Sequence, residues 1–268
     1  MNEWTKRSYE IAQKSGYLDK LYGVFPVILN GDREIDSNVM EYLEKFYTSK
    51  DRYNFMKVLI SLDTMPVNFP YLTLIKKNAH YLDTNPLIFK IITDHLFSMD
   101  FDDIYDKLKK PINGTRQIGP MFKTWVKNGK LGLRIFNDPS IFKKSREDGI
   151  LDGSDSMLML YAKENLFYSR DKGLDLIIRV NGKYIVCENK FITDFGGAQN
   201  NQFRDAVETA SQGLKAECIE KGIYYVALLD GIVYTNEGGI FYNTLKNNDD
   251  LLLMSVLVLG DFINSLRY

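Results

Sequence analysis

The segment 174–190, LDLIIRVNGKYIVCENK, constrains the fold more than any other part of the chain. Two strand-forming runs flank Asn181-Gly182, and an Asn-Gly pair in that setting is the strongest short-range signal for a β-hairpin. A two-residue turn sets the register, so the numbers of facing residues sum to 363. Asp175 then lies opposite Glu188, and Lys190 lies on the same face two residues further along. The sequence therefore predicts two carboxylates and an amine at the open end of a hairpin.

This predicted cluster is chemically suited to a divalent cation. Facing carboxylates destabilise a strand pair unless something neutralises them. Mg²⁺ prefers carboxylate and carbonyl oxygens, so Asp175, Glu188 and the backbone carbonyl of Asn189 are candidate ligands. Lys190 would orient or deprotonate a water, or add positive charge at the transition state. The alternative is a surface hairpin whose charges pair in solvent, which would contribute at most about 1 kcal/mol.

Composition indicates the class of protein and the cellular compartment in which this chemistry would operate. The chain has 268 residues, 45% of them hydrophobic and 26% charged, which suits one large globular domain or two modest ones. Two cysteines, Cys187 and Cys218, are too few for a disulfide framework, so we expect reduced, buried thiols in a cytoplasmic protein. The opening residues lack an apolar signal-peptide core, and the longest apolar run, 251–259, is about half a membrane span. No contact with a membrane is expected.

Other common enzyme classes find little support in the residues. His80 and His95 are the two histidines, which disfavours His-rich zinc sites and a Ser-His-Asp triad. No Gly-x-x-x-x-Gly-Lys-Ser/Thr loop is present, so the usual nucleotide-phosphate site is excluded.

The chain divides into two regions by pattern. Residues 1–105 show apolar residues at helical spacing, with Asp36 or Ser37 as a helix N-cap, and predict a helical region for recognition or dimerisation. Residues 106–268 alternate between helices and strands: a helix capped at Ser154, the hairpin, a helix over 199–213 and a strand within 222–231. This order predicts an α/β (α+β) fold with a mixed central sheet flanked by helices.

Residues 107–146 form a strongly basic segment. They include eleven lysines and arginines and one acid, Asp138, for a formal charge of +10, whereas the rest of the chain sums to −11. This uneven distribution of charge suggests that the segment forms a positive face that binds a polyanion. The segment mixes bases with aromatic and amide side chains, which favours contact with a DNA backbone by Arg116, Gln117, Lys123 and Lys127. The alternative is a pair of solvated, charge-rich helices.

Asp175, twelve intervening residues and then Glu188-Asn189-Lys190 at the end of an apolar strand resemble the PD-(D/E)XK nuclease superfamily. The flanking stretches LDGSDSMLMLYAKENLFYSRDKGLDLI and KFITDFGGAQNNQFRDA are similar to type II restriction endonucleases of that superfamily, over about residues 110–235. Leu174 replaces the proline of the motif. The resemblance implies a further acid from the helix before the hairpin: Glu164 fits best, Asp171 is the alternative, and a solvent-facing glutamate is the simpler interpretation.

The resemblance also implies that the segment after Lys190 approaches DNA. Gly196 and Gly197 would let the backbone come close to a phosphate. Carboxamides pair bidentately with adenine and arginine contacts guanine or phosphate, so the candidate DNA contacts are Gln199, Asn200, Asn201, Gln202 and Arg204. The alternative is a polar helix cap that only solvates the turn.

Together these features predict a Mg²⁺-dependent type II restriction endonuclease that cuts double-stranded DNA. Restriction sites are usually symmetric, so a homodimer is expected. Two alternatives stay open: a structure-selective repair or junction nuclease of the same superfamily, and a non-catalytic DNA-binding regulator. The recognition sequence and the cut position do not follow from the residues.

Overall fold

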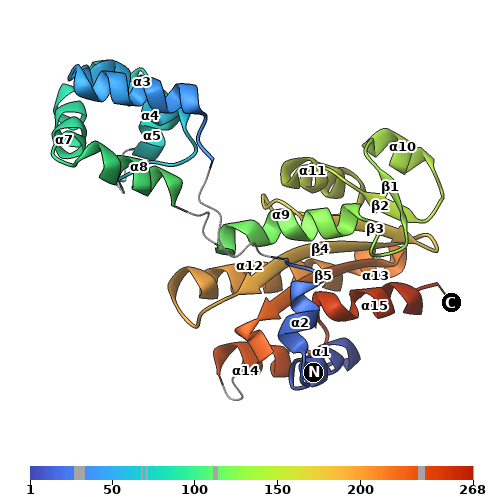
Figure 1. Ribbon diagram of the computed structural model, residues 1–268. Helices are drawn as coiled ribbons and strands as arrows, with labels where there is room; N and C mark the ends of the chain where they lie inside the picture. The colour runs from blue at the N-terminus through green and yellow to red at the C-terminus, as the bar shows by residue number, and fades with distance from the viewer. Residues whose placement is uncertain (27–33, 68, 70–71, 111–113, 235–238, 268) are drawn as a thin grey trace. The chain divides into compact units, whose positions relative to one another are not determined.

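The computed structural model describes residues 1–26, 34–67, 69, 72–110, 114–234 and 239–267 (Figure 1). The chain forms two compact units. Unit 1 combines residues 1–27 with 114–268, and unit 2 comprises residues 28–113. The predicted boundary near residue 105 differs from the structural division in two respects: residues 1–27 group with the C-terminal part of the chain, and residues 106–113 group with unit 2.

Unit 1 is a mixed α/β structure, which confirms the predicted fold class. Its helices and short helical turns are α1 (Glu3–Ala12), α2 (Tyr17–Tyr22), α9 (Gly114–Lys127), α10 (Pro139–Lys144), α11 (Asp155–Asn165), α12 (Gly197–Ser211), η1 (Gln212–Leu214), α13 (Ala216–Lys221), η2 (Ile232–Tyr234), α14 (Ile240–Asn247), η3 (Val256–Val258) and α15 (Leu259–Ser265). Its strands are β1 (Arg134–Phe136), β2 (Gly149–Leu151), β3 (Leu176–Val180), β4 (Lys183–Ile192), β5 (Ile223–Gly231) and β6 (Leu252–Met254).

The strands form one sheet in the order β1-β2-β3-β4-β5-β6. The pairs β2/β3 and β3/β4 are antiparallel, whereas β1/β2, β4/β5 and β5/β6 are parallel. In the hairpin, Leu176 faces Cys187 and Val180 faces Lys183, which confirms the register predicted from the Asn181-Gly182 turn. Both turn residues have positive φ, 49° and 74°, as a type I′ turn requires.

Helices cover both faces of this sheet (Figure 1). On one face, α11 and α13 pack against Val186 and Tyr225, and α12 reaches Glu188 through Thr209. On the other face, α2 and α9 pack near Cys187 and α15 packs on β5. Alternate residues of β4 therefore point into different layers, and both layers exclude water from the strand that carries the predicted site.

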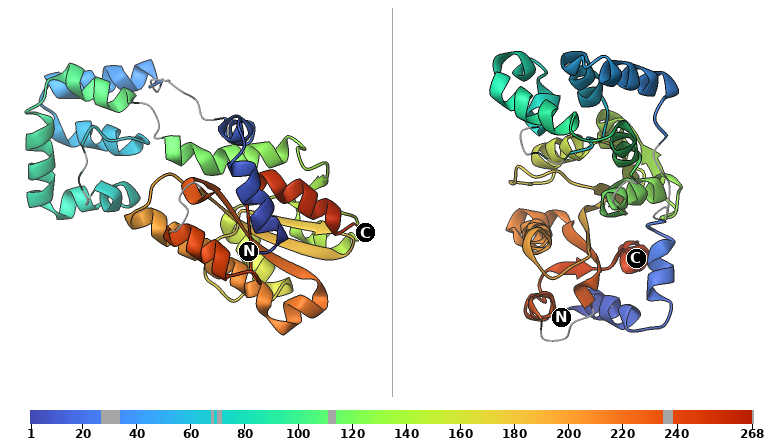
Figure 2. Two further views of the ribbon diagram at one scale, coloured as in Figure 1. Left: turned by 90° about the horizontal axis from the view of Figure 1, so that it is seen from below. Right: turned by 60° about the vertical axis from the view of Figure 1, so that its left-hand side comes forward.

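The first helices are anchored to the C-terminal end of unit 1 (Figure 2). Asn2 caps α1 and donates its side-chain amide to the carbonyl of Leu251 at 2.6 Å. Trp4 packs edge-on against Phe262 of α15. These contacts explain why the N-terminal residues belong to unit 1 although helical periodicity alone groups them with the helices that follow.

Unit 2 is helical in its described part. Its helices are α3 (Ser37–Thr48), α4 (Arg52–Ser61), α5 (Leu72–Lys77), α6 (Tyr81–Thr84), α7 (Pro86–Leu96) and α8 (Phe101–Lys109). Asp36 caps α3 by accepting from the amide of Asn38 at 2.8 Å, one of the two caps predicted. Phe55, Leu59 and Leu96 are fully buried in its core. Across the described residues of both units, no helix combines the length and apolar character needed to cross a membrane.

Candidate active site

The hairpin brings Asp175, Glu188 and Lys190 together, as the register predicts. Asp175 comes directly before β3, where its amide donates to the carbonyl of Cys187 at 3.0 Å. Its Oδ2 accepts from the amide of Asn189 at 2.8 Å. The Nζ of Lys190 lies 3.1 Å from Oε1 of Glu188 and 4.0 Å from Oδ2 of Asp175. Two carboxylates and one amine therefore converge on one face of β4.

Burial raises the desolvation cost of the charged side chains in this cluster. The Glu188 side chain is 0% exposed, that of Asp175 is 17% exposed and that of Lys190 is 23% exposed. Desolvation raises the pKa of the Asp175 carboxyl, and Asp155 and Glu188 raise it further. The ammonium of Lys190 and the amide of Asn189 lower the same pKa and offset part of that effect. The site therefore favours added positive charge beside its carboxylates.

The donor set fits a hard divalent cation. Within the described residues, no three side chains of His, Cys, Asp or Glu form a ready-made metal-binding group. A cation here would therefore combine the carboxylates of Asp175 and Glu188 with backbone oxygen and water, a combination typical of Mg²⁺. Oε1 of Glu188 is buried and forms an ion pair with the ammonium of Lys190 at 3.1 Å. A carboxylate oxygen has two lone pairs, so Oε1 can also bind a cation.

A third acid, Asp155, lies beside this pair. The carbonyl of Asp155 accepts from the amide of Leu174 at 3.2 Å, and its carboxylate contributes to the raised pKa of Asp175. The pairing of two strands in the structure accounts for this placement. Strand β2 pairs with β3, and continuing that register puts Gly153 opposite Asp175, two residues before Asp155. The cap formed by Ser154 then begins α11 at this edge of the sheet.

The acids predicted from the resemblance lie elsewhere. Glu164 is exposed near the end of α11, nine residues beyond Asp155 and so about 14 Å further along the helix axis. Asp171 is 92% exposed and forms an ion pair with Lys163. Neither is among the charges that shift the pKa of Asp175. Of the acids of α11, Asp155 in the first turn is the one that lies level with Asp175.

A known protein family matches nearly the whole chain. The model of the Tsp45I type II restriction enzyme family matches residues 2–266. The chain belongs to this family. No curated protein and no solved structure gave a match. Membership makes the chain a type II restriction enzyme, a site-specific deoxyribonuclease acting on DNA, and confirms the family predicted from the residues.

In this member of the Tsp45I family, the basic segment 107–146 divides between the two units, and its four predicted DNA contacts all belong to unit 1. Lys107, Lys109 and Lys110 belong to unit 2, whereas residues 114–146 belong to unit 1. On α9, Lys123 forms an ion pair with Asp155, and Lys127 lies 3.0 Å from Asp152. The side chains of Arg116 and Gln117 lie outside the described residues. Part of the positive charge of the segment is thus neutralised by acids beside the candidate site.

Helix α12 carries the other predicted DNA contacts of this restriction enzyme. Its N-terminus at Gly196 has no side-chain cap, and Gln199 instead accepts from the amide of Thr193 at 3.3 Å. Asn201 and Arg204 are exposed, whereas Asn200 and Gln202 are half-buried. Oδ1 of Asn200 is buried without a hydrogen bond. The exposed members are thus accessible for contact with DNA.

Both cysteines are free and buried, as predicted. Cys187 lies on β4 directly before Glu188, pointing into the opposite layer. Burial raises the pKa of its thiol well above the ordinary value, so it stays protonated and unreactive.

Proposed function

We propose that this restriction enzyme hydrolyses phosphodiester bonds of double-stranded DNA in a Mg²⁺-dependent reaction at the Asp175–Glu188–Lys190 cluster. The observation that carries the proposal is the convergence of these three side chains, with Glu188 fully buried and its Oε1 3.1 Å from the ammonium of Lys190. A structural ion pair at a hairpin end would place its charges in solvent. A buried, oxygen-rich pair beside one lysine is what a divalent cation and a reacting phosphate require.

Each residue has a distinct part in this proposal. Asp175, Glu188 and the carbonyl of Asn189 would hold Mg²⁺, with Asp155 available as a further oxygen ligand or through a water. When bound, Mg²⁺ supplies positive charge to a phosphate oxygen and lowers the pKa of a coordinated water. Lys190, within 4.0 Å of both carboxylates, would orient the attacking water and stabilise the charge that develops on the phosphate.

DNA would be held by residues on both sides of this cluster. Lys123 and Lys127 can exchange their carboxylate partners for phosphates, and Arg116 and Gln117 at the start of α9 are further candidates. Exposed side chains of α12, with Arg204 foremost, would reach the grooves, and Gln199, Asn200, Asn201 and Gln202 are the amides available there. Residues 28–113 would add recognition or dimer contacts.

A homodimer acting in the cytoplasm is part of the proposal. A symmetric recognition site presents the same phosphodiester on both strands, so two copies related by a two-fold axis would place one cluster on each. Free, buried cysteines are compatible with a reducing compartment.

The test is incubation of the purified full chain with plasmid and bacteriophage DNA in MgCl₂ or in EDTA. Discrete fragments in MgCl₂ and intact DNA in EDTA are expected, and sequencing of the fragment ends would give the recognition site. Cleavage that persists in EDTA would contradict the metal requirement. A preference for branched over linear DNA would instead favour a junction nuclease, and retardation without cleavage a regulator.

A further inference from the structure

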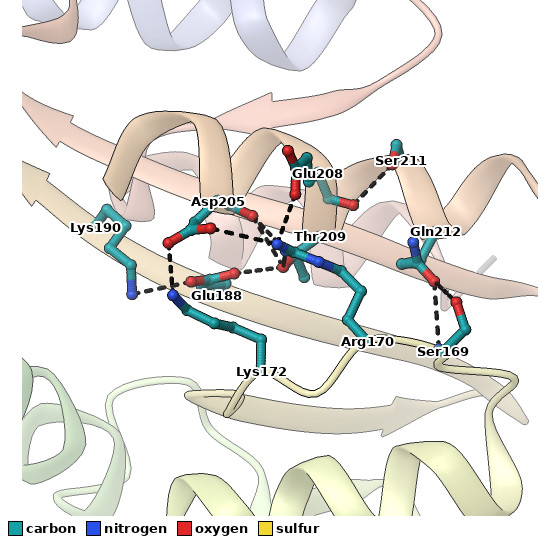
Figure 3. Close-up of polar contacts among 10 residues, drawn as sticks. All are labelled: Ser169, Arg170, Lys172, Glu188, Lys190, Asp205, Glu208, Thr209, Ser211 and Gln212. Carbon is teal, nitrogen blue, oxygen red and sulfur yellow. Dashed lines mark hydrogen bonds and ion pairs between the residues drawn. The ribbon is translucent and has the colours of Figure 1, made fainter. Parts of the chain in front are cut away.

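The second carboxylate oxygen of Glu188 is held by Thr209 from helix α12 (Figure 3). The hydroxyl of Thr209 donates a hydrogen bond to Oε2 of Glu188, and both residues are 0% exposed. Oε1, the other oxygen of the same carboxylate, faces Lys190. The two oxygens of Glu188 therefore have different neighbours: Lys190 from the same strand, and Thr209, 21 residues further along the chain, from α12.

Arg170 determines the direction in which the Thr209 hydroxyl donates. Its Nη1 lies 2.7 Å from Oγ1 of Thr209 and 2.7 Å from the backbone carbonyl of Asp205. That carbonyl is also the intrahelical alternative for the hydroxyl, at 3.2 Å. Arginine can only donate, so Arg170 occupies a lone pair of Oγ1 and competes for the carbonyl. The single hydroxyl proton is thereby directed to Glu188.

Arg170 is itself fixed by acids of the same helix. Its Nη2 lies 2.7 Å from Oε2 of Glu208 and 3.4 Å from Oδ1 of Asp205, and its side chain is 18% exposed. Asp205 is also held by Lys172 at 2.5 Å. Figure 3 shows these groups as one connected network between the loop before β3 and the face of α12 that meets β4. A planar guanidinium with several partners holds its geometry better than a lone ion pair.

We propose that Thr209, oriented by Arg170, is a positioning residue that sets the rotamer of Glu188 and directs Oε1 to the proposed cation. Removing the hydroxyl leaves Oε2 buried without a donor. The carboxylate then rotates toward other donors, and Oε1 no longer points to the cation that Asp175 would also bind. The inference rests on the proposed metal-dependent function. Loss of an outer group of this kind weakens metal binding or activity by about 10- to 100-fold.

The experiment uses variants that separate the hydroxyl from the shape of the side chain. Thr209→Val keeps the volume and removes the hydroxyl, whereas Thr209→Ser keeps the hydroxyl. Ser211→Ala is the matched control, because this half-buried hydroxyl of the same helix donates to the carbonyl of Glu208 and has no other side-chain hydrogen bond within the described residues. Binding of MnCl₂ to the DNA-free full chain is measured by calorimetry, cleavage is measured across MgCl₂ concentrations, and thermal unfolding reports the fold.

The expected result is that Thr209→Val weakens Mn²⁺ binding and raises the MgCl₂ needed for half-maximal cleavage by about 10- to 100-fold. Thr209→Ser and Ser211→Ala should stay close to wild type. Wild-type Mn²⁺ affinity in Thr209→Val, or a loss in Thr209→Ser as large as in Thr209→Val, would overturn the positioning role.

Two further outcomes are distinguishable. If Thr209→Val does not fold, Arg170→Lys takes its place, because lysine keeps the charge but cannot contact Thr209 and Asp205 in the same fork. Weakened Mn²⁺ binding in folded Arg170→Lys supports the inference, and unchanged binding overturns it. A wild-type chain that neither binds Mn²⁺ nor cuts DNA in MgCl₂ would overturn the proposed function itself.

Discussion

Glu188 shows at the residue scale how a strand can carry a charge into a core. Its side chain is fully buried, and a buried charge without partners is costly. Lys190 neutralises one side of the carboxylate and the Thr209 hydroxyl satisfies the other. Each oxygen of Glu188 therefore has a partner, and the proposed cation would bind on the side that faces Lys190 and Asp175.

Asp155 and Glu164 provide a residue-scale test of which acid completes the cluster. Asp155→Asn removes a charge that acts on Asp175, so we expect cleavage in MgCl₂ to slow by about 10- to 100-fold. Glu164→Gln, at the exposed far end of the same helix, should cut at the wild-type rate. Single-turnover rates on one DNA substrate would check both. A larger loss in Glu164→Gln than in Asp155→Asn would favour the acid inferred from the family resemblance.

At the scale of elements, strand β5 is tied to the N- and C-terminal helices through one buried acid. Asp230 accepts from Oγ of Ser255 at 2.5 Å and from the amide of Val256 at 3.0 Å. The amide of Ser255 in turn donates to Oγ of Ser8 in α1 at 2.9 Å. These bonds join β5, α1 and the residues that begin η3. They also explain why residues 1–27 fold with the sheet.

Burial raises the pKa of Asp230 to about 7, which makes the stability of unit 1 depend on pH. Between about pH 4 and pH 7 the folded chain keeps a proton that the unfolded chain releases, so this contribution to stability falls as pH rises through that window. The loss would reach up to about 4 kcal/mol. Urea unfolding at a series of pH values should show this slope in the wild type and a flatter one in Asp230→Asn.

The control for that series is Asp261→Asn, which changes a carboxyl that is 55% exposed and paired with Arg7. It should keep the wild-type pH slope. Equal slopes in the wild type and in Asp230→Asn would show that Asp230 is ionised in the folded chain across the whole range.

At the scale of the whole molecule, the predictable features were those set by local rules. The Asn181-Gly182 turn determined the register, and the register determined the convergence of Asp175, Glu188 and Lys190. The Ser154 cap and the β5 strand likewise follow from nearby residues. These features depend on residues close together in the sequence, or on a turn that allows a single register between the two strands it joins.

Features that depend on distant segments were missed. The place of Asp155 depends on the pairing of β2 with β3, and that of Thr209 on the packing of α12 against β4. The assignment of residues 1–27 to unit 1 depends on contacts such as Trp4 with Phe262, at opposite ends of the chain. No local periodicity encodes which distant partner a helix meets.

The most direct test of the central claim is the cleavage rate of Lys190→Ala on DNA containing the mapped site. Lys183→Ala, at the turn end of the same strand, is the matched control. Loss of a charge that stabilises the transition state should slow cleavage by on the order of 100-fold or more. DNA retardation in CaCl₂ should be unchanged. We expect Lys183→Ala to cut normally, whereas wild-type turnover by Lys190→Ala would contradict the assignment of the active site to this hairpin.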